Sequence, residues 1–307
     1  MNYKEKYGKV AVIMGGTSPE REISLISGQG MLEAYLRLGV DAYKFDPAEK
    51  SICELKNMGF DRAVLAMHGK GGEDGTLQGA LEYLKIPYSG SGVMASSIAM
   101  DKHRTKLIWQ ALGLPVAKWQ HLTEKDYRAG NFKLQLELPV IIKPAREGST
   151  IGITKLYTLD KLEAAIELAF KSDTALLIEK LIIGDEFTAT IFNNKVYPIV
   201  KIEAPNKDYD YKNKYFTDDT KYICPWNFAK LQNEVEKSAL ECYLAVGANG
   251  IARIDFMMDK NECIYFLEIN TLPGMTGHSL VPMAFKAVGV SYDELCLYIL
   301  DEASCGK

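Results

Sequence analysis

Short apolar runs alternate with longer amphipathic stretches through the first hundred residues. The runs Val10–Met14, Val40–Phe45 and Arg62–Met67 have the length and composition of buried strands. Between them, apolar residues recur at helical spacing over Glu22–Leu38 and Ala48–Met58. Because a β-α-β-α-β order gives parallel strands with helical crossovers, this region is predicted to be a Rossmann-like parallel sheet with helices on both faces.

The remaining two thirds of the chain contain two further α/β regions. The first is predicted to comprise a basic amphipathic helix at Asp101–Gly113, strands at Val116–His121 and within Leu138–Lys143, a helix at Leu159–Phe170 and a strand at Ala175–Lys180. The second is predicted to comprise strands at Glu186–Phe192 and Lys195–Val200, a helix at Asn227–Val246, and paired strands at Ile251–Asp259 and Cys263–Asn270. Between its strands, the polar and aromatic stretch Pro205–Pro225 is predicted to be a lid or binding loop.

Polar, glycine-rich loops follow the first and third strands, at the sheet edge where parallel sheets bind ligands. They read GGTSPERE (residues 15–22) and HGKGGEDG (residues 68–75). His68 follows a buried strand directly and could bind a carboxylate or phosphate, although a surface histidine fits the same spacing nearly as well. Further on, Ser279 follows a Pro-Gly turn and is expected to cap a helix.

The stretch LPVIIKPAREGSTIG (residues 138–152) begins as a buried strand and ends in charge, glycine and hydroxyl groups. Lys143 offers a fixed cation, and the loop 147–152 offers backbone N–H groups and hydroxyls, which a nucleoside triphosphate requires. The sequence contains no Walker motif, so a P-loop NTPase is disfavoured. Taken alone, a strand-exit turn with a solvated lysine explains the pattern equally well.

Two strands near the C-terminus carry a second group of polar residues. Alternation places Arg253 and Asp255 on one face of their strand, and Glu268 and Asn270 on one face of theirs. A hairpin turning near residues 260–261 would bring Asp255 opposite Glu268. Two carboxylates and an amide oxygen suit Mg²⁺, which binds one or two carboxylates together with substrate phosphates. The alternative is a structural ion-pair cluster on an amphipathic hairpin.

Charge and cysteine content exclude several classes of protein. With 36 basic and 40 acidic residues, a net charge of −4 and no block of like charges, the chain has no feature of a nucleic-acid or membrane binder. A short N-terminal apolar run and the absence of 18 consecutive apolar residues favour a cytoplasmic protein. Six scattered cysteines are expected to be reduced and mostly buried. The G-x-G-x-x-A match at residues 90–95 lacks an acid twenty positions on, so helix-start glycines are favoured over a dinucleotide site.

Seven collinear motifs together resemble the D-alanine:D-alanine ligases of the ATP-grasp superfamily. They are GGTSPEREIS, HGKGGEDGTLQG, YSGSGVMASSIAMDK, VIIKPAREGSTIG, KYFTDDTKY, ARIDFM and LEINTLPGMTGHSLVP. The resemblance implies three α/β domains: an N-terminal Rossmann-like domain (1–98), a central ATP-grasp subdomain (99–184) and a C-terminal subdomain with the lid and metal site (185–307). It also implies a cytoplasmic homodimer.

The same resemblance implies a reaction and a set of roles. Two D-alanines would be joined, through a D-alanyl phosphate made with ATP, into D-alanyl-D-alanine for peptidoglycan. ATP would be bound by Lys102, Lys143, Glu147, Gly148, Ser149, Thr150, Glu179, Leu181, Glu186 and Lys214. Two Mg²⁺ ions, which Mn²⁺ could replace, would bind Asp255, Glu268 and Asn270. The amino acids would meet Glu20, His68, Ser279 and Leu280, with Ser149 and Tyr215 linked to Glu20 and with Arg253 and the Gly274 amide facing the oxyanion.

Three other functions remain open from the residues. An ATP-grasp ligase for a different acid and amine, including one that forms a depsipeptide, shares the nucleotide and metal residues. An NAD-dependent oxidoreductase would use the G-x-G-x-x-A glycines, and a non-catalytic nucleotide sensor would use the loop after Lys143. Neither of the last two needs Asp255, Glu268 and Asn270 beside Arg253.

Overall fold

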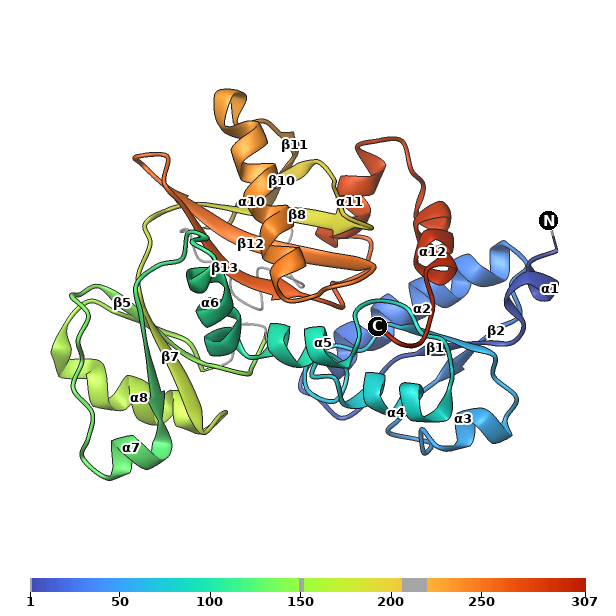
Figure 1. Cartoon of the computed structure of the whole chain (residues 1–307), viewed down its shortest axis with the longest axis horizontal. Coiled ribbons are helices and arrows are strands. Elements are labelled where there is room, and N and C mark those ends of the chain that lie inside the picture. The colour runs from blue at the N-terminus through green and yellow to red at the C-terminus, as the bar shows by residue number, and fades with distance from the viewer. Residues whose placement is uncertain (1, 149–151, 206–219) are drawn as a thin grey trace.

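The computed structural model describes residues 2–148, 152–205 and 220–307 (Figure 1). Its first sheet is parallel, with strand order β2-β1-β3, as the sequence predicts. The strands are β1 (Val10–Ile13), β2 (Ala42–Phe45) and β3 (Arg62–Leu65). The helices of this part are α1 (Tyr3–Tyr7), α2 (Arg21–Arg37), α3 (Glu54–Asn57), α4 (Thr76–Leu84) and α5 (Val93–Met100). Their apolar faces cover both sides of the sheet, and Gly92 precedes α5 at its N-cap.

The second sheet is antiparallel, with strand order β4-β7-β5-β6. Its strands are β4 (Trp119–Thr123), β5 (Val140–Pro144), β6 (Thr154–Leu156) and β7 (Ala175–Lys180). Helix α8 (Leu162–Phe170), after the 3₁₀ turn η1 (Leu159–Lys161), packs on this sheet, and α7 (Glu124–Arg128) follows β4. Helix α6 (Lys102–Ala111) enters this part from α5, and Figure 1 shows it between the second and third sheets.

The third sheet has the order β11-β10-β8-β12-β13, with β9 paired to β8. Its strands are β8 (Gly184–Phe192), β9 (Lys195–Val196), β10 (Ile199–Glu203), β11 (Lys221–Trp226), β12 (Ile251–Asp259) and β13 (Ile264–Asn270). The 3₁₀ turn η3 (Ala229–Leu231), α10 (Gln232–Ala245), α11 (Leu280–Lys286) and α12 (Tyr292–Asp301) complete this part. The α/β fold class predicted from the sequence is confirmed.

The end of the chain packs on its beginning. Helix α12 lies along α2 (Figure 1), and the Tyr35 hydroxyl donates a hydrogen bond of 2.9 Å to the Cys296 carbonyl. Tyr88 and Ser304 form an isolated antiparallel bridge beside β3. The Lys307 ammonium donates to the Gly90 carbonyl at 2.7 Å. Residues after 290 therefore complete the core of the first sheet.

Three local predictions are wrong for identifiable reasons. Only α3 forms within the expected helix Ala48–Met58, because the Asp46 carboxylate accepts from the Ala48 N–H and stabilises a turn. Pro198 separates β9 from β10, which the sequence predicts as one strand. The expected loop Pro205–Pro225 ends in strand β11, an edge strand in which Pro225 is tolerated.

The cysteines also differ from expectation. All six are free, but only Cys242 and Cys296 are buried, while three are exposed. Within the described residues, no helix is long and apolar enough to cross a membrane.

Candidate active site

The β12–β13 hairpin forms the centre of the polar cluster. Asp255 pairs directly with Glu268 across the strands, as alternation predicts. The Arg253 guanidinium donates from Nε and one terminal nitrogen to the two oxygens of Asp255, each at 2.8 Å. The Asn270 amide nitrogen donates to Asp255 at 3.1 Å. The Lys102 ammonium lies 3.1 Å from a Glu268 oxygen. Asp255 and Glu268 therefore each contact a different cation.

The composition of this cluster bears on metal binding. The described residues contain no group of three or more His, Cys, Asp or Glu side chains arranged to hold a metal. Asp255, Glu268 and the Asn270 amide instead offer hard oxygen atoms on paired strands, a donor set that fits Mg²⁺ sharing its coordination with phosphates. The amide presents its nitrogen, not its oxygen, to Asp255, because an anion needs a donor there.

Three buried charges connect the second sheet to α6. The Glu179 carboxylate on β7 forms an ion pair with Lys143 on β5 and another with Lys106 on α6, at 2.6 Å. Glu179 is 2% exposed and Lys106 is fully buried. Burial alone would raise the pKa of Glu179, but the two lysines outweigh it and the pKa is lowered. Burial lowers the pKa of Lys106, against the attraction of Glu179.

The Lys102 side chain links Glu268 of the hairpin to the loop after β5. Its ammonium donates to the Glu147 carbonyl at 2.7 Å in addition to its contact with Glu268. Burial by itself would lower the pKa of Lys102, but the nearby carboxylates, led by Glu268, raise it. Lys102 is thus a buried, charged group at the meeting point of α6, the loop after β5 and β13.

Glu20, at the start of α2, faces the same loop from the N-terminal side. A Cβ atom added to Gly148 would collide with a Glu20 carboxylate oxygen, so any larger residue there would have to displace the Glu20 carboxylate. Glu73 lies near Glu20 and accepts from the Gly69 N–H at 2.8 Å. Burial and the Glu20 charge raise the pKa of Glu73 to about 8. Glu73 is therefore mostly protonated at pH 7.

His68 is buried, which excludes the interpretation as a surface histidine. Only 5% of the residue is exposed, and its Nε2 lies 3.3 Å from the Ser27 hydroxyl on α2. Burial lowers the pKa of His68 to about 4, despite a backbone hydrogen bond with Leu272. The Ser27 hydroxyl also accepts from the Met275 N–H at 3.2 Å. His68 is a neutral group held between α2 and the segment after β13.

The turn after β13 brings Gly274 and Ser279 together. A Cβ at Gly274 would lie 2.9 Å from the Ser279 hydroxyl, so a larger residue there would displace that hydroxyl. Ser279 occupies the N-cap position of α11, as expected, but its side chain does not cap the helix. Its hydroxyl instead accepts from the Thr276 N–H at 2.9 Å. Leu280, the first residue of α11, is buried.

The residues expected to contact adenine and ribose lie at the junction of β7 and β8. The Leu181 N–H donates to the Pro139 carbonyl at 3.0 Å, so a contact of this N–H with adenine would compete with that bond. Glu186 lies on β8, paired with Ile202 and Met257. Four other expected site residues fall outside the described residues: Ser149, Thr150, Lys214 and Tyr215.

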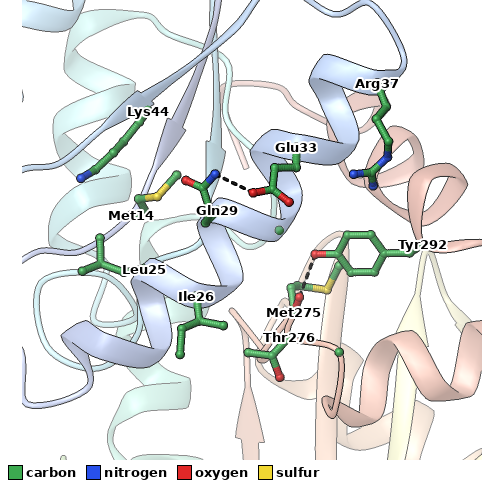
Figure 2. Close-up of a pocket in the computed structure, with 12 residues that line it drawn as sticks. Met14, Leu25, Ile26, Gln29, Glu33, Arg37, Lys44, Met275, Thr276 and Tyr292 are labelled. Atoms are coloured by element: carbon green, nitrogen blue, oxygen red, sulfur yellow. Dashed lines mark hydrogen bonds between the residues drawn. The ribbon is translucent and has the colours of Figure 1, made fainter.

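A pocket of about 710 Å³ lies on the outer face of α2. Figure 2 shows that Gln29 and Glu33 of α2 are hydrogen-bonded and that Tyr292 of α12 points at Met275. The Tyr292 hydroxyl donates to the Met275 carbonyl at 2.7 Å. Because the Met275 N–H contacts Ser27, this pocket borders the residues that hold His68.

Sequence reasoning missed three residues of this cluster: Ser27, Glu73 and Lys106. Glu73 lies inside the glycine-rich loop 68–75, so its position was a usable signal. Lys106 lies four residues after Lys102, which puts both on one face of α6. Nothing local marks Ser27, because its role depends on the packing of α2 against His68.

Solved structures identify the class of this fold. A D-alanine–D-alanine ligase from Bacillus anthracis matches with a TM-score of 0.84, 35% identity and 96% coverage of both chains. The same enzyme has been solved with ATP, and that structure matches with a TM-score of 0.83. A D-Ala:D-Ser ligase, VanG from Enterococcus faecalis, matches with a TM-score of 0.82 and 29% identity, over 96% of this chain and 98% of that chain. The protein therefore has the ATP-grasp fold of these ligases.

The family follows from the sequence comparisons. Family models described as D-ala D-ala ligase C-terminus and N-terminus match residues 108–301 and 41–91. A D-alanine–D-alanine ligase from Aromatoleum aromaticum is 50% identical, covering 98% of this chain and 97% of the relative. A D-alanine–D-alanine ligase B from Chromobacterium violaceum is 50% identical, over 98% and 100%. The chain belongs to the D-alanine–D-alanine ligase family.

Proposed function

We propose that this chain joins two D-alanines into D-alanyl-D-alanine at the expense of ATP, for peptidoglycan precursor synthesis. The observation that carries the proposal is that groups able to bind phosphate and a group able to bind an ammonium lie beside the same loop, the one after β5. Lys102 contacts Glu268 of the hairpin and the Glu147 carbonyl of the loop after β5. Gly148 of that loop abuts Glu20, which could receive an ammonium group. A nucleotide and an amino acid bound there would lie side by side.

The first step activates a carboxylate, which an amine cannot attack directly. A carboxylate oxygen of the first D-alanine attacks the γ-phosphorus, the bond to ADP breaks, and an acyl phosphate forms. Lys102 and Lys143 would offset the phosphate charges and hold the reacting groups in line. Asp255, Glu268 and Asn270 would hold two Mg²⁺ ions, which Mn²⁺ could replace and which supply charge neutralisation for phosphoryl transfer when bound.

In the second step, the free amine of the second D-alanine attacks the acyl carbon, phosphate leaves with its electron pair, and the proton that the amine nitrogen loses goes to the departing phosphate. Negative charge develops on the carbonyl oxygen in the tetrahedral intermediate. Arg253 and the Gly274 N–H would donate to this oxygen. The Asp255 carboxylate holds the guanidinium through two hydrogen bonds, so Arg253 is oriented before the substrate binds.

The amino-acid side must bind two zwitterions. Glu20 would bind the ammonium of the first D-alanine. Neutral His68, Ser279 and the backbone at Leu280 would contact carboxylate or phosphoryl oxygens as hydrogen-bond donors. Lys214, Tyr215 and Ser149, which the resemblance assigns to the same site, lie outside the described residues.

The test is ATP-dependent phosphate release with Mg²⁺, with the products weighed by mass spectrometry. D-alanine alone should give phosphate and the dipeptide, and L-alanine should give neither. D-alanine with D-serine or D-lactate tests the second substrate, since the matched VanG structure is a D-Ala:D-Ser ligase. Release with another acid and amine pair, and none with D-alanine, would overturn the substrate assignment while leaving the ligase chemistry intact.

The boundaries 1–98, 99–184 and 185–307 and a cytoplasmic homodimer form part of the same proposal. Three exposed apolar side chains support an interface on the first domain: Ile26 and Leu36 on α2, and Tyr43 on β2. Sedimentation equilibrium measures whether the protein is a dimer in solution. A dimer that Ile26→Lys and Leu36→Lys dissociate would support this face, and a monomer at micromolar concentration would exclude it.

A further inference from the structure

Lys106 is a fully buried cation that cannot contact a bound nucleotide directly, because none of its surface is accessible. Its ammonium lies 2.6 Å from Glu179 Oε1 and donates to the Phe266 carbonyl at 3.0 Å. Phe266 precedes Glu268 on the same strand by two residues. Lys106 therefore connects the second sheet to the strand that carries the acidic pair.

Glu179 is shared between two lysines. Its second oxygen pairs with Lys143, which register places diagonally across the β5–β7 pair and on the same face. One carboxylate between two ammonium groups leaves a net charge of +1. Without Lys106, Glu179 and Lys143 would form a neutral pair, and Lys143 would offer a phosphate much less attraction.

We infer that Lys106 is a positioning residue for nucleotide binding, which shares the Glu179 carboxylate with Lys143 and so keeps Lys143 able to bind an ATP phosphate. The inference rests on the proposed function, in which Lys143 binds phosphate. It differs from a packing role, because a neutral side chain of the same size would preserve packing but not the charge.

The experiment measures nucleotide affinity by calorimetry with two probes, Mg²⁺–ATP and adenosine. Lys106→Met should weaken ATP binding about tenfold, as expected for loss of a close buried charge pair. Adenosine carries no phosphate, so its affinity should stay within about twofold of the native value. Thermal unfolding checks the fold, and Lys106→Gln, which can still donate to Phe266, replaces Lys106→Met if that variant does not fold.

A double variant separates charge from packing. Adding Glu179→Gln to Lys106→Met removes the carboxylate that neutralises Lys143. Because Glu179 is itself expected to contact the nucleotide, both probes are compared, and the ratio of ATP affinity to adenosine affinity should return to within about threefold of the native ratio. A packing defect would instead weaken both probes further, without recovery of that ratio. Arg104→Met is the matched control on the same helix, because that side chain is 65% exposed and its loss should leave both affinities unchanged.

Three results would overturn the inference: equal losses of ATP and adenosine affinity in Lys106→Met, native ATP affinity in that variant, or no recovery in the double variant. Lys143→Met is the benchmark. Native ATP affinity in Lys143→Met would remove the phosphate role of Lys143 from the proposed function and overturn the inference with it. A strong loss there, with none in Lys106→Met, would overturn the inference alone.

Discussion

The side of the site proposed to bind phosphate and the side proposed to bind the amino acids hold their buried and half-buried polar groups in different charge states. On the phosphate side, charged groups meet in pairs, with Arg253 on Asp255 and Lys102 on Glu268. On the amino-acid side, His68 has a pKa of about 4 and Glu73 a pKa of about 8. At pH 7 these two residues are mostly uncharged and act through hydrogen bonds.

The contrast follows from what each side would bind. A triphosphate brings about four negative charges and needs cations that can exchange a carboxylate partner for a phosphate. An amino acid is neutral overall, so one anion for its ammonium and several neutral donors suffice. Burying unpaired charges on that side would cost several kcal/mol per ion. Four predictions test this contrast, from the largest expected effect to the smallest.

Removal of divalent metal should abolish phosphate release, because Lys102 and Lys143 alone leave the ATP charge uncompensated. The measurement is turnover after chelation and after adding back MgCl₂ or MnCl₂. The melting temperature should not change on chelation, because the described residues hold no cluster of the kind that forms a structural metal site. A rate that persists in chelator would place phosphate binding on the lysines alone.

Arg253→Ala should reduce kcat about 100- to 1,000-fold, the usual cost of losing an oxyanion donor. The Kd of ATP should change less than about threefold, since the residue acts on the acyl oxygen. Arg253→Lys keeps the charge but not the paired hydrogen bonds to Asp255, so its kcat should lie between those of the native protein and Arg253→Ala. A near-native rate for Arg253→Ala would exclude the oxyanion role.

Gly148→Ala should lower kcat/KM for D-alanine about 10- to 100-fold, because the new methyl group displaces the Glu20 carboxylate. Adding Glu20→Asp, which is one methylene shorter, should recover part of the loss. Gly277→Ala is the control, since an added Cβ there meets nothing within 4 Å. If Gly148→Ala changes kcat/KM for ATP more than kcat/KM for D-alanine, the loop contacts only the phosphates and not the amino acid.

The smallest effects concern stability against pH. The Glu73 pKa is raised from 4.5 to about 8, so native stability falls as pH rises through that window. Glu73→Gln should therefore melt about 2–4 °C higher than the native protein at pH 9 and equally at pH 5. The His68 pKa is lowered from 6.5 to about 4, so native stability falls as the pH drops below 6.5. His68→Gln should therefore melt at a higher temperature than the native protein only below pH 6.5. Melting temperatures of native and variant proteins that run parallel against pH would show that folding shifts neither pKa.

Local pattern was enough to predict most elements and the facing acidic pair. β7 and β12 begin and end at the predicted residues, because both are rich in aliphatic side chains and each follows a short polar or glycine-containing turn. The pairing of Asp255 with Glu268 follows from alternation and a short turn. β11 was missed because only alternate residues are sheltered on an edge strand, and polar residues surround it.

The sequence could not predict the burial of these polar groups or the protonation state that follows from it. His68 fits a surface position by spacing, and only its packing under α2 makes it neutral. Glu73 acquires its high pKa from burial beside Glu20, which lies more than fifty residues earlier. Lys106 looks like one more residue of a basic helix until β7 and β13 are placed against it. These properties belong to contacts between distant segments.

The packing of α12 on α2 also determines when the first domain can be finished during synthesis. The Tyr35 hydroxyl needs the Cys296 carbonyl, and the strand-like segment at Tyr88 needs Ser304. At about 5–20 residues per second, the ribosome takes roughly 10–40 s to travel from residue 98 to these partners. During that interval α2, which positions Glu20 and Ser27, exposes the apolar surface that α12 later covers. The nascent chain is thus most exposed to chaperones and proteases at the helix that would bind the amino acids.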